Sequence, residues 1–225
     1  FKTPIRGLEI YKGDAKLFGQ LTVGGGKIMA SGLVSIGGAL AKADDLLFVN
    51  NQIKANHATF IIKSKNPSKP VLEVSDVAIT YDFLKKNALI QSLNKLEKII
   101  LPNNQVSLGF EQMLWLFDSQ DIELNSGASL LYIRSNNINH KGLDFLAKKV
   151  SYSFADKTLA IEGVAGIHVS NATIVPQGGK VLMAEGAKID TLKNAKVMLD
   201  NSREEHSLST GEILIISKEK FDGIG

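Results

Sequence analysis

The sequence contains no cysteine among its 225 residues. This absence excludes disulfide frameworks, thiolate zinc sites and cysteine nucleophiles. It also suits an oxidising envelope or extracellular space, where stray thiols are a liability. The chain has no window of ~20 apolar residues, so no segment is expected to cross a bilayer as a helix.

The chain also lacks any run of five or more basic residues, and its formal net charge is only +3. Nucleic acid is therefore not expected as a partner. Hydrophobic residues make up 44% of the chain and charged residues 22%, which indicates a folded protein and not a disordered one. The length allows one sizeable β domain or two small ones.

Two glycine-containing segments match known motifs only in part. Gly24-Gly25-Gly26-Lys27 has Leu21 where a phosphate loop needs glycine and Ile28 where it needs Ser or Thr. A dinucleotide fingerprint would need glycine at Met29. The segment Gly32 to Gly37 has Leu33 where the first glycine of a nucleophile elbow belongs. Neither nucleotide binding nor an elbow serine is expected.

The first 48 residues consist of short apolar runs separated by glycines. Glycine at every corner is what a solenoid coil needs, because corners demand positive φ or close backbone approach. From Asp44 onward the pattern changes to hairpins. Leu46 to Val49 turns at Asn50-Asn51 and returns through residues 53–62, and Val77 to Phe83 alternates in the same way.

The C-terminal half, residues 142–216, carries the most regular pattern. Val150 to Phe154 alternates large and small side chains, Ala155-Asp156-Lys157 turns, and Leu159 to Ile161 returns, which predicts a hairpin with Tyr152 and Phe154 on one buried face. Three fragments resemble one repeated strand seed: Ala172-Thr173-Ile174, Ala187-Lys188-Ile189 and Ala195-Lys196-Val197.

These patterns predict a mostly β fold, an elongated stacked-hairpin or β-solenoid (folded-over sheet) architecture, with one short helix near 87–101. Leu89, Leu93, Leu96 and Ile100 have the helical spacing, and a strand pair is the alternative. We expect a single elongated β domain over 1–225, with a soft boundary near 66–70. Both ends read as mid-chain sequence, so we expect a segment of a larger protein.

Candidate chemistry is sparse. His57, His140, His168 and His206 are isolated from one another, and we expect His168 in a strand and His140 in a solvated loop. The carboxylates Asp118, Asp121 and Glu123 crowd one turn and could hold a hard cation, but a solvated turn is the preferred interpretation.

Two further features have ordinary structural explanations. Glu204-Glu205-His206 is interpreted as a surface loop, and Trp115 as part of the core. We therefore predict no catalytic, cofactor-binding or metal-binding residues and no cofactor.

Two stretches resemble known families. Residues 39–62 (ALAKADDLLFVNNQIKANHATFII) and 143–163 (LDFLAKKVSYSFADKTLAIEG) have the cadence of the β-repeats of OstA-like lipopolysaccharide-transport proteins, whose strands and tight turns stack into an open, folded-over sheet. Residues 101–115, 163–176 and 189–206 resemble large uncharacterised β-repeat envelope proteins of Gram-negative bacteria. The resemblance implies a β architecture in the cell envelope, periplasmic or outer-membrane associated, and carries over no catalytic residue.

Three functions are consistent with these observations. The first is a non-catalytic structural or binding segment of a large cell-envelope protein, whose partners are other segments of that protein or other envelope proteins. The second is a periplasmic lipid or lipopolysaccharide carrier with an apolar groove. The third is a β-helix polysaccharide-processing enzyme, which would need paired carboxylates facing one groove. We expect the first, and hence no enzyme.

Overall fold

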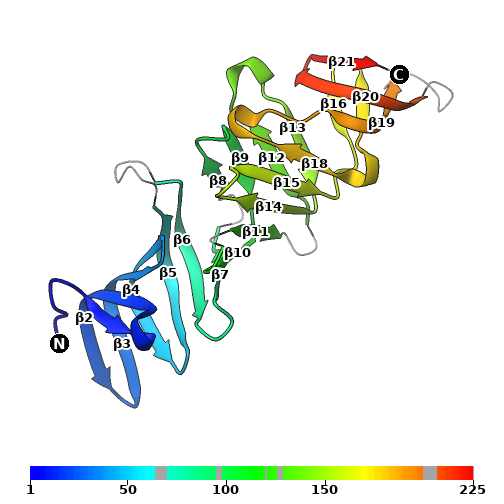
Figure 1. The fold of residues 1–225 in the computed structure, drawn as a ribbon. Helices are drawn as coiled ribbons and strands as arrows, with labels where there is room; N and C mark the ends of the chain where they lie inside the picture. The colour runs from blue at the N-terminus through cyan, green and yellow to red at the C-terminus, as the bar shows by residue number, and fades with distance from the viewer. Residues whose placement is uncertain (64–69, 95–97, 120, 126–128, 200–206, 225) are drawn as a thin grey trace. The chain divides into compact units, whose positions relative to one another are not determined.

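A computed structural model describes residues 1–63, 70–94, 98–119, 121–125, 129–199 and 207–224 (Figure 1). The fold is mostly β, with 65% of residues in strands. The described residues include short 3-10 turns but no α-helix. Every strand pair is antiparallel, and neither a solenoid nor a closed barrel is identified in this part of the chain.

The helix expected near 87–101 is wrong. The described part of this segment forms two strands, β7 (Asn87–Ser92) and β8 (Lys98–Leu101). Burial in β7 has a period of two, since Ala88 and Ile90 are buried while the residues between and after them are more exposed. β7 is hydrogen-bonded on both sides, by β6 and β10, and these ladders override the helical spacing of the leucines.

The chain divides into two compact units, each described here by itself. The first comprises Phe1–Ile99 and Glu111–Ile122, and the second comprises Ile100–Phe110 and Glu123–Gly225. Residues 66–69 of the expected soft boundary lie outside the described residues, and the strands on either side, β5 and β6, pair within the first unit. The expectation of one domain over 1–225 stays a prediction.

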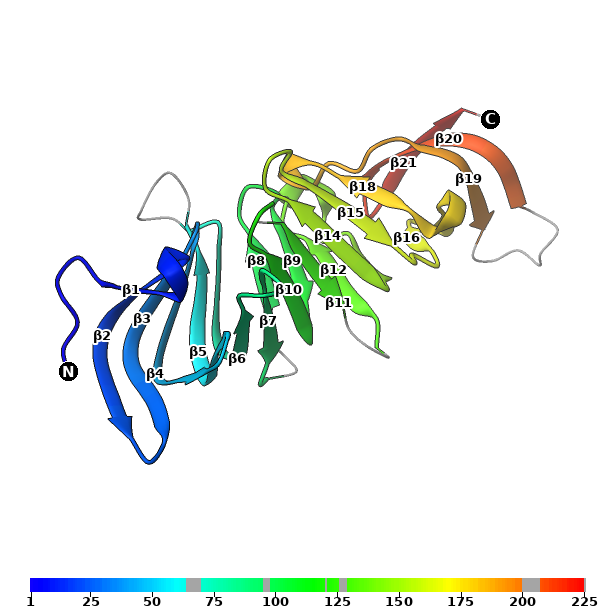
Figure 2. The ribbon, with the colours of Figure 1, turned by 60° about the horizontal axis from the view of Figure 1, so that its bottom comes forward.

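The first unit is a meander in which almost every strand pairs with the next one along the chain (Figure 2). The hairpin predicted at Asn50-Asn51 is confirmed, because Val49 pairs with Gln52 and Asn50 has a φ of 48°. In sheet order the strands are β1 (Leu8–Ile10), β2 (Ala15–Gly24), β3 (Lys27–Ile36), β4 (Ala39–Val49), β5 (Gln52–Ile62), β6 (Leu72–Asp82), β7 and β10 (Gln112–Leu116).

The glycines of the first unit lie in β-hairpins, and not at the solenoid corners that the sequence pattern predicts. Gly25 and Gly26 form the turn between β2 and β3, with φ values of 58° and 72°. Gly19 and Gly32 instead face each other across the β2–β3 ladder. A Cβ on Gly32 would lie 2.2 Å from the carbonyl oxygen of Phe18, so the two backbones approach more closely than any side chain permits.

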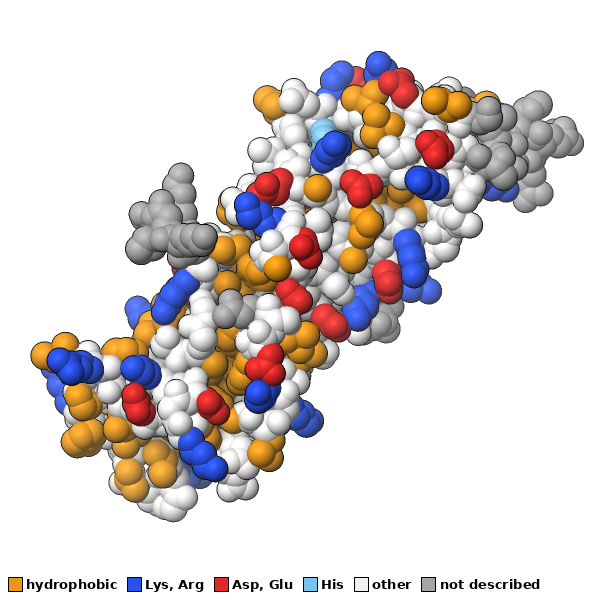
Figure 3. Space-filling view, viewed as in Figure 1, with side chains coloured by type: hydrophobic (Ala, Val, Ile, Leu, Met, Phe, Trp, Pro, Cys, Tyr) orange, Lys and Arg blue, Asp and Glu red, His pale blue; other side chains and the backbone are white. Residues whose placement is uncertain are grey.

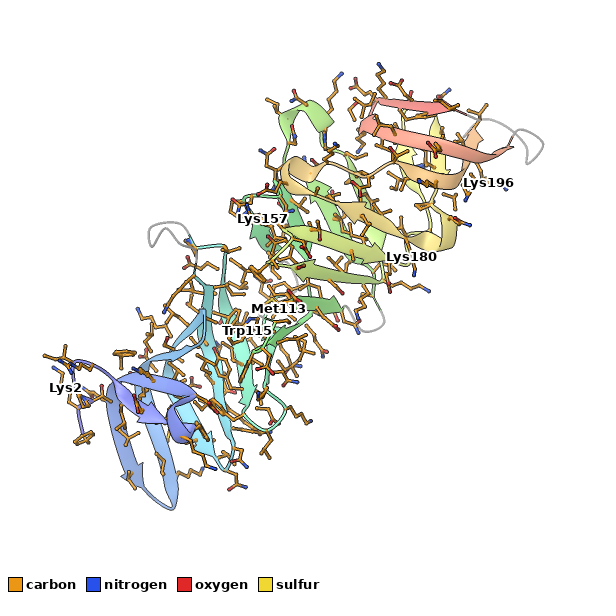
Figure 4. The ribbon with its side chains drawn as sticks, viewed as in Figure 1. Lys2, Met113, Trp115, Lys157, Lys180 and Lys196 are labelled. Atoms are coloured by element: carbon orange, nitrogen blue, oxygen red, sulfur yellow. The ribbon has the colours of Figure 1, made fainter. Side chains whose placement is uncertain are left out.

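The core of the first unit lies on one face of this sheet. The alternation predicted for Val77 to Phe83 is confirmed from Val77 to Tyr81, since Val77, Ile79 and Tyr81 are buried, but it ends there because Asp82 is buried and Phe83 only half-buried. Trp115 is also buried, as predicted, with its ring centroid 5.8 Å from that of Phe60. Met113 and Trp115 are both on β10 (Figure 4).

One aromatic contact joins strands that are distant in the sheet order of the first unit. Tyr11 belongs to a 3-10 turn, Tyr11–Gly13, that directly follows β1. Its ring stacks on Phe83 at the end of β6, with 3.9 Å between centroids, and its hydroxyl donates to the carbonyl oxygen of Gln52 at 2.8 Å. The start of the sheet therefore folds back onto the strand ends of β5 and β6.

The second unit uses mostly shorter strands, which belong to three sheets. Pro176 is followed by a 3-10 turn at Gln177–Gly179. One sheet has the order β11 (Ile122–Asn125), β14 (Lys149–Ser153), β15 (Thr158–Glu162) and β18 (Val181–Met183); the second has β13 (Asp144–Ala147), β12 (Leu131–Ser135), β9 (Val106–Gly109) and β8; the third has β16 (Ile167–Val169), β17 (Ala172–Val175), β19 (Leu192–Leu199), β20 (Ser207–Ser217) and β21 (Lys220–Ile224).

The hairpin predicted around Ala155-Asp156-Lys157 is confirmed as β14 and β15. Tyr152 is buried, whereas Phe154 is only half-buried, so the prediction of a fully buried face holds for Tyr152 alone. Phe154 lies in the turn, one residue after β14 ends. Its ring packs edge-on against the ring of Tyr152, with 4.7 Å between the ring centroids.

The repeated strand seed is confirmed at two of its three positions. Ala172 to Ile174 lies in β17, and Ala195 to Val197 lies in β19. The fragment Ala187 to Ile189 instead leaves a 3-10 turn, Glu185–Ala187, and makes one isolated bridge from Ile189 to Met183. Ala187 has a φ of 60°, which is incompatible with a continuous strand.

Candidate functional site

The described histidines lie apart in the structure. His57 is exposed and its Nδ1 lies 2.7 Å from a carboxylate oxygen of Asp76. His168 is exposed in β16, as predicted, with its Nδ1 3.0 Å from the hydroxyl of Thr173. His140 is half-buried, which corrects the expectation of a solvated side chain, and burial lowers its pKa. His206 lies outside the described residues.

Two of the three carboxylates predicted to crowd one turn, Asp118 and Glu123, form ion pairs. Asp118 lies 3.3 Å from the ammonium of Lys86, and Glu123 lies 3.0 Å from that of Lys149. No group of three or more His, Asp or Glu residues in the described part of the chain is arranged to hold a metal ion. The loop Glu204-Glu205-His206 lies outside the described ranges.

The two incomplete glycine motifs are both parts of β-hairpins. Lys27 pairs with Gly24 at the end of the β2–β3 hairpin. Ser35 lies inside β3, where an elbow serine would have to lie on a strand-to-helix turn. Both segments are accounted for by strand pairing.

Ser135 and His140 form a contact that the sequence did not indicate. The Ser135 hydroxyl lies 3.0 Å from Nδ1 of His140, a distance suited to a nucleophile and its base. However, Ser135 is buried, with 4% of its surface exposed, and its hydroxyl also accepts a hydrogen bond from the Asn137 N–H. A buried serine engaged in a turn is not available to a substrate.

The same arrangement recurs at the other buried polar side chains. In the described residues, four polar or charged side chains are buried: Asp82, Asn104, Ser135 and Ser217. Asp82 accepts hydrogen bonds from the N–H groups of Leu84 and Lys85, and Ser217 accepts one from the N–H of Glu219.

Asn104 completes this set. Its side-chain N–H donates to the carbonyl oxygen of Lys157 at 2.7 Å, which ties two loops of the second unit together. Each buried polar side chain in this set thus binds backbone groups of a turn or loop.

The second unit contains a groove of about 670 Å³. It forms where β13, the edge of one sheet, lies beside β16, the edge of another. In the chain, β13 directly precedes β14 and β16 follows β15. β14 and β15 pair with each other as far as Lys149 and Glu162, and past these residues the two segments enter different sheets. Apolar side chains line much of the groove, among them Leu130, Phe145, Leu146 and Ala165.

A polar network lies at one side of the groove. Asp144 accepts hydrogen bonds from the ammonium of Lys218 at 2.6 Å and from the hydroxyl of Tyr132 at 3.0 Å. The Lys218 contact is the main cause that lowers the pKa of Asp144. Burial, followed by the bond to Asp144, raises the pKa of Tyr132. Asp144 thus remains ionised and fixes Lys218 at the groove.

On the opposite side of the groove, two glycines leave space for neighbouring side chains. A Cβ on Gly163 would lie 2.6 Å from Cγ of Lys148, and one on Gly166 would lie 2.6 Å from Cγ2 of Thr173. The stem of Lys148 therefore packs against the backbone at Gly163, and its ammonium remains exposed at the rim. The lining residues come from segments as far apart as Leu130 and Lys218, so no local sequence pattern marked them.

The visible surface carries both signs of charge side by side. Figure 3 shows lysine and arginine interspersed with aspartate and glutamate, with apolar side chains between them. Within the described residues, no helix has the length and hydropathy required to span a membrane.

Comparisons of the chain with protein-family models, with curated proteins and with solved structures found no match.

Proposed function

We propose that the chain is a non-catalytic structural or binding segment of a large cell-envelope protein, in the periplasm or at the outer membrane. The observation that carries the proposal is the use of the buried polar side chains. Asp82, Asn104, Ser135 and Ser217 all bind turn or loop backbone. Catalytic groups are usually arranged around a cleft, and none of these four lines the groove of the second unit.

A folded-over sheet is the architecture we propose for such a segment. The stacking of Tyr11 on Phe83 supports it in the first unit, because it brings the first strand back across the sheet. In the second unit, β13–β14 and β15–β16 each pass from one sheet to another, with Lys148 and Gly163 at the change. The cadence of residues 39–62 and 143–163 agrees with both features.

The test is an activity panel of glycan, ester and phosphate substrates combined with elemental analysis of the purified chain. We expect no turnover and no stoichiometric transition metal. A turnover that is abolished by Asp121→Asn or Glu123→Gln, or one zinc or iron per chain, would overturn the proposal.

The groove favours a second candidate function, a carrier of lipid or lipopolysaccharide. An apolar groove that is open to solvent can hold an acyl chain. Mass spectrometry of the purified chain would support this function by finding a retained acyl chain. The polysaccharide-processing alternative has less support, because Asp144 is the single carboxylate on the described groove lining and no pair faces this groove.

A further inference from the structure

The groove of the second unit combines an apolar lining with an excess of positive charge. Leu130 and Leu146 are 47% and 45% exposed. They lie together on the groove lining with Phe145 and Ala165. A groove of about 670 Å³ also falls within the range typical of small-molecule sites.

The charges around the groove do not cancel. The lining residues include Lys148 and Lys218 but only one carboxylate, Asp144. Asp144 is already engaged by Lys218, and Arg134 is a further cation close to Asp144. Lys148 makes no ion pair within the described residues, so its charge is available to a ligand.

The position of Lys148 is fixed by its neighbours. Its stem packs on Gly163, whose missing side chain leaves the space, and its N–H donates to the carbonyl oxygen of Glu162 at 2.9 Å. Lys148 is therefore an exposed residue of the groove lining, beside the apolar side chains. A ligand matching this arrangement has an apolar chain and a negatively charged head.

We propose that this groove binds a single-chain anionic amphiphile, with its chain against Leu130, Phe145 and Leu146 and its head at Lys148. The inference rests on the carrier function proposed above and adds the charge of the ligand. Binding would remove apolar surface from water and place the anion beside an unpaired cation.

The experiment is a titration of the 15N-labelled 225-residue chain with two dodecyl probes of different head charge, below their micelle concentrations. Dodecyl phosphate is the anionic probe and dodecyl maltoside the neutral one, and the amide shifts of Gly163, Gly166 and His168 report binding. We expect dodecyl phosphate to bind roughly fivefold more tightly, the effect of one lysine near an anionic head.

Two variants and a matched control sharpen the result. Lys148→Glu should weaken dodecyl phosphate roughly tenfold and leave dodecyl maltoside unchanged, because it reverses one charge at the rim. Leu146→Glu should weaken both probes, because it places a charge on the apolar lining. Lys188→Glu changes an exposed lysine of the same unit that does not line the groove, and it should change neither affinity.

The outcomes separate this inference from the function on which it rests. Equal binding of the two probes at the groove, or a Lys148→Glu variant that binds dodecyl phosphate like the unaltered chain, would overturn the anionic preference and leave the carrier function standing. No shift at Gly163, Gly166 and His168 with either probe would overturn both.

Discussion

The two compact units use the same antiparallel pairing with very different strands. In the first unit, β3 to β6 are 10 or 11 residues long and follow one another as hairpins. In the second unit, β12 to β18 are 3 to 5 residues long and alternate among sheets, and only β19 and β20, of 8 and 11 residues, are longer among its described strands. Long ladders satisfy most of their own backbone groups, whereas short strands leave many groups at their ends.

The buried polar side chains are placed accordingly. Among the described residues, Asn104, Ser135 and Ser217 lie in the second unit, where chain reversals are frequent, and Asp82 alone lies in the first. Stability in the first unit thus depends on apolar packing and close backbone approach, and stability in the second depends also on hydrogen bonds at turns. Substitutions of each kind test this difference.

The largest effect is expected at Trp115. Trp115→Ala should destabilise the fold by about 3–5 kcal/mol, because it removes a large buried ring. Its indole N–H has no hydrogen-bond partner among the described residues, so the loss is one of packing. Denaturant unfolding measures it.

Phe154→Ala, at a half-buried aromatic of the second unit, is the matched control and should lose only about 1 kcal/mol. Equal losses in the two variants would contradict the burial described for these rings.

The next effect is expected where two backbones approach in the first unit. Gly32→Ala should cost about 2–4 kcal/mol, because Gly32 has a φ of 142° and a Cβ would meet the Phe18 carbonyl oxygen. Gly24→Ala, with no atom within 4 Å of the added Cβ, should change stability by less than about 0.5 kcal/mol. Thermal unfolding of both variants checks the pair, and a Gly32→Ala protein as stable as Gly24→Ala would show that the register across β2–β3 is wrong.

A smaller effect is expected at the loop tie of the second unit. Asn104→Ala should cost about 1–3 kcal/mol, because it leaves the carbonyl oxygen of Lys157 without its buried partner. Asn171→Ala, at an exposed turn of the same unit, is the control and should be nearly neutral. Denaturant midpoints compare the two, and a neutral Asn104→Ala would remove the main support for turn ties in this unit.

Several elements were predictable because their signals are local. The alternation of Val77, Ile79 and Tyr81 and the turn residues at Asn50-Asn51 specify strands and hairpins without reference to the rest of the chain. The same locality misled the prediction at β7. Leu89 and Leu93 fit a helix in isolation, but pairing with β6 and β10 determines the structure.

The features that join distant segments could not be predicted. Gly19 lies opposite Gly32 because of the register between β2 and β3. His140 is half-buried because of the turn around Ser135. The groove forms because the chain on either side of the β14–β15 hairpin enters different sheets, as β13 and β16. It also requires Lys218 to contact Asp144, which lies 74 residues away in the sequence. The absence of local catalytic motifs was visible in the sequence, whereas the use of the buried polar groups was not.

The smallest effect is a pH dependence in the first unit. The Lys85 N–H and the Gln52 side chain are the main causes that lower the pKa of Asp82. A carboxyl whose pKa is lower in the folded state stabilises the fold fully above its unfolded pKa of about 4, and that contribution is lost as pH falls through the lower folded value. In the Asp82→Asn variant, the free energy of unfolding should therefore fall less steeply below about pH 4 than in the unaltered chain. Parallel curves of unfolding free energy against pH for the two proteins would contradict the assignment.

The central claim, that buried polar groups hold turns and perform no chemistry, is tested most directly at Ser135. The Ser135 hydroxyl lies 3.0 Å from Nδ1 of His140, a distance suited to a nucleophile and its base. Catalytic groups are commonly held at a cost to stability, so replacing one often leaves the fold as stable or more stable. The measurement is the unfolding free energy of Ser135→Ala. We predict a loss of about 1 kcal/mol, from the hydrogen bonds to Asn137 and His140; an unchanged or increased stability would contradict the structural role.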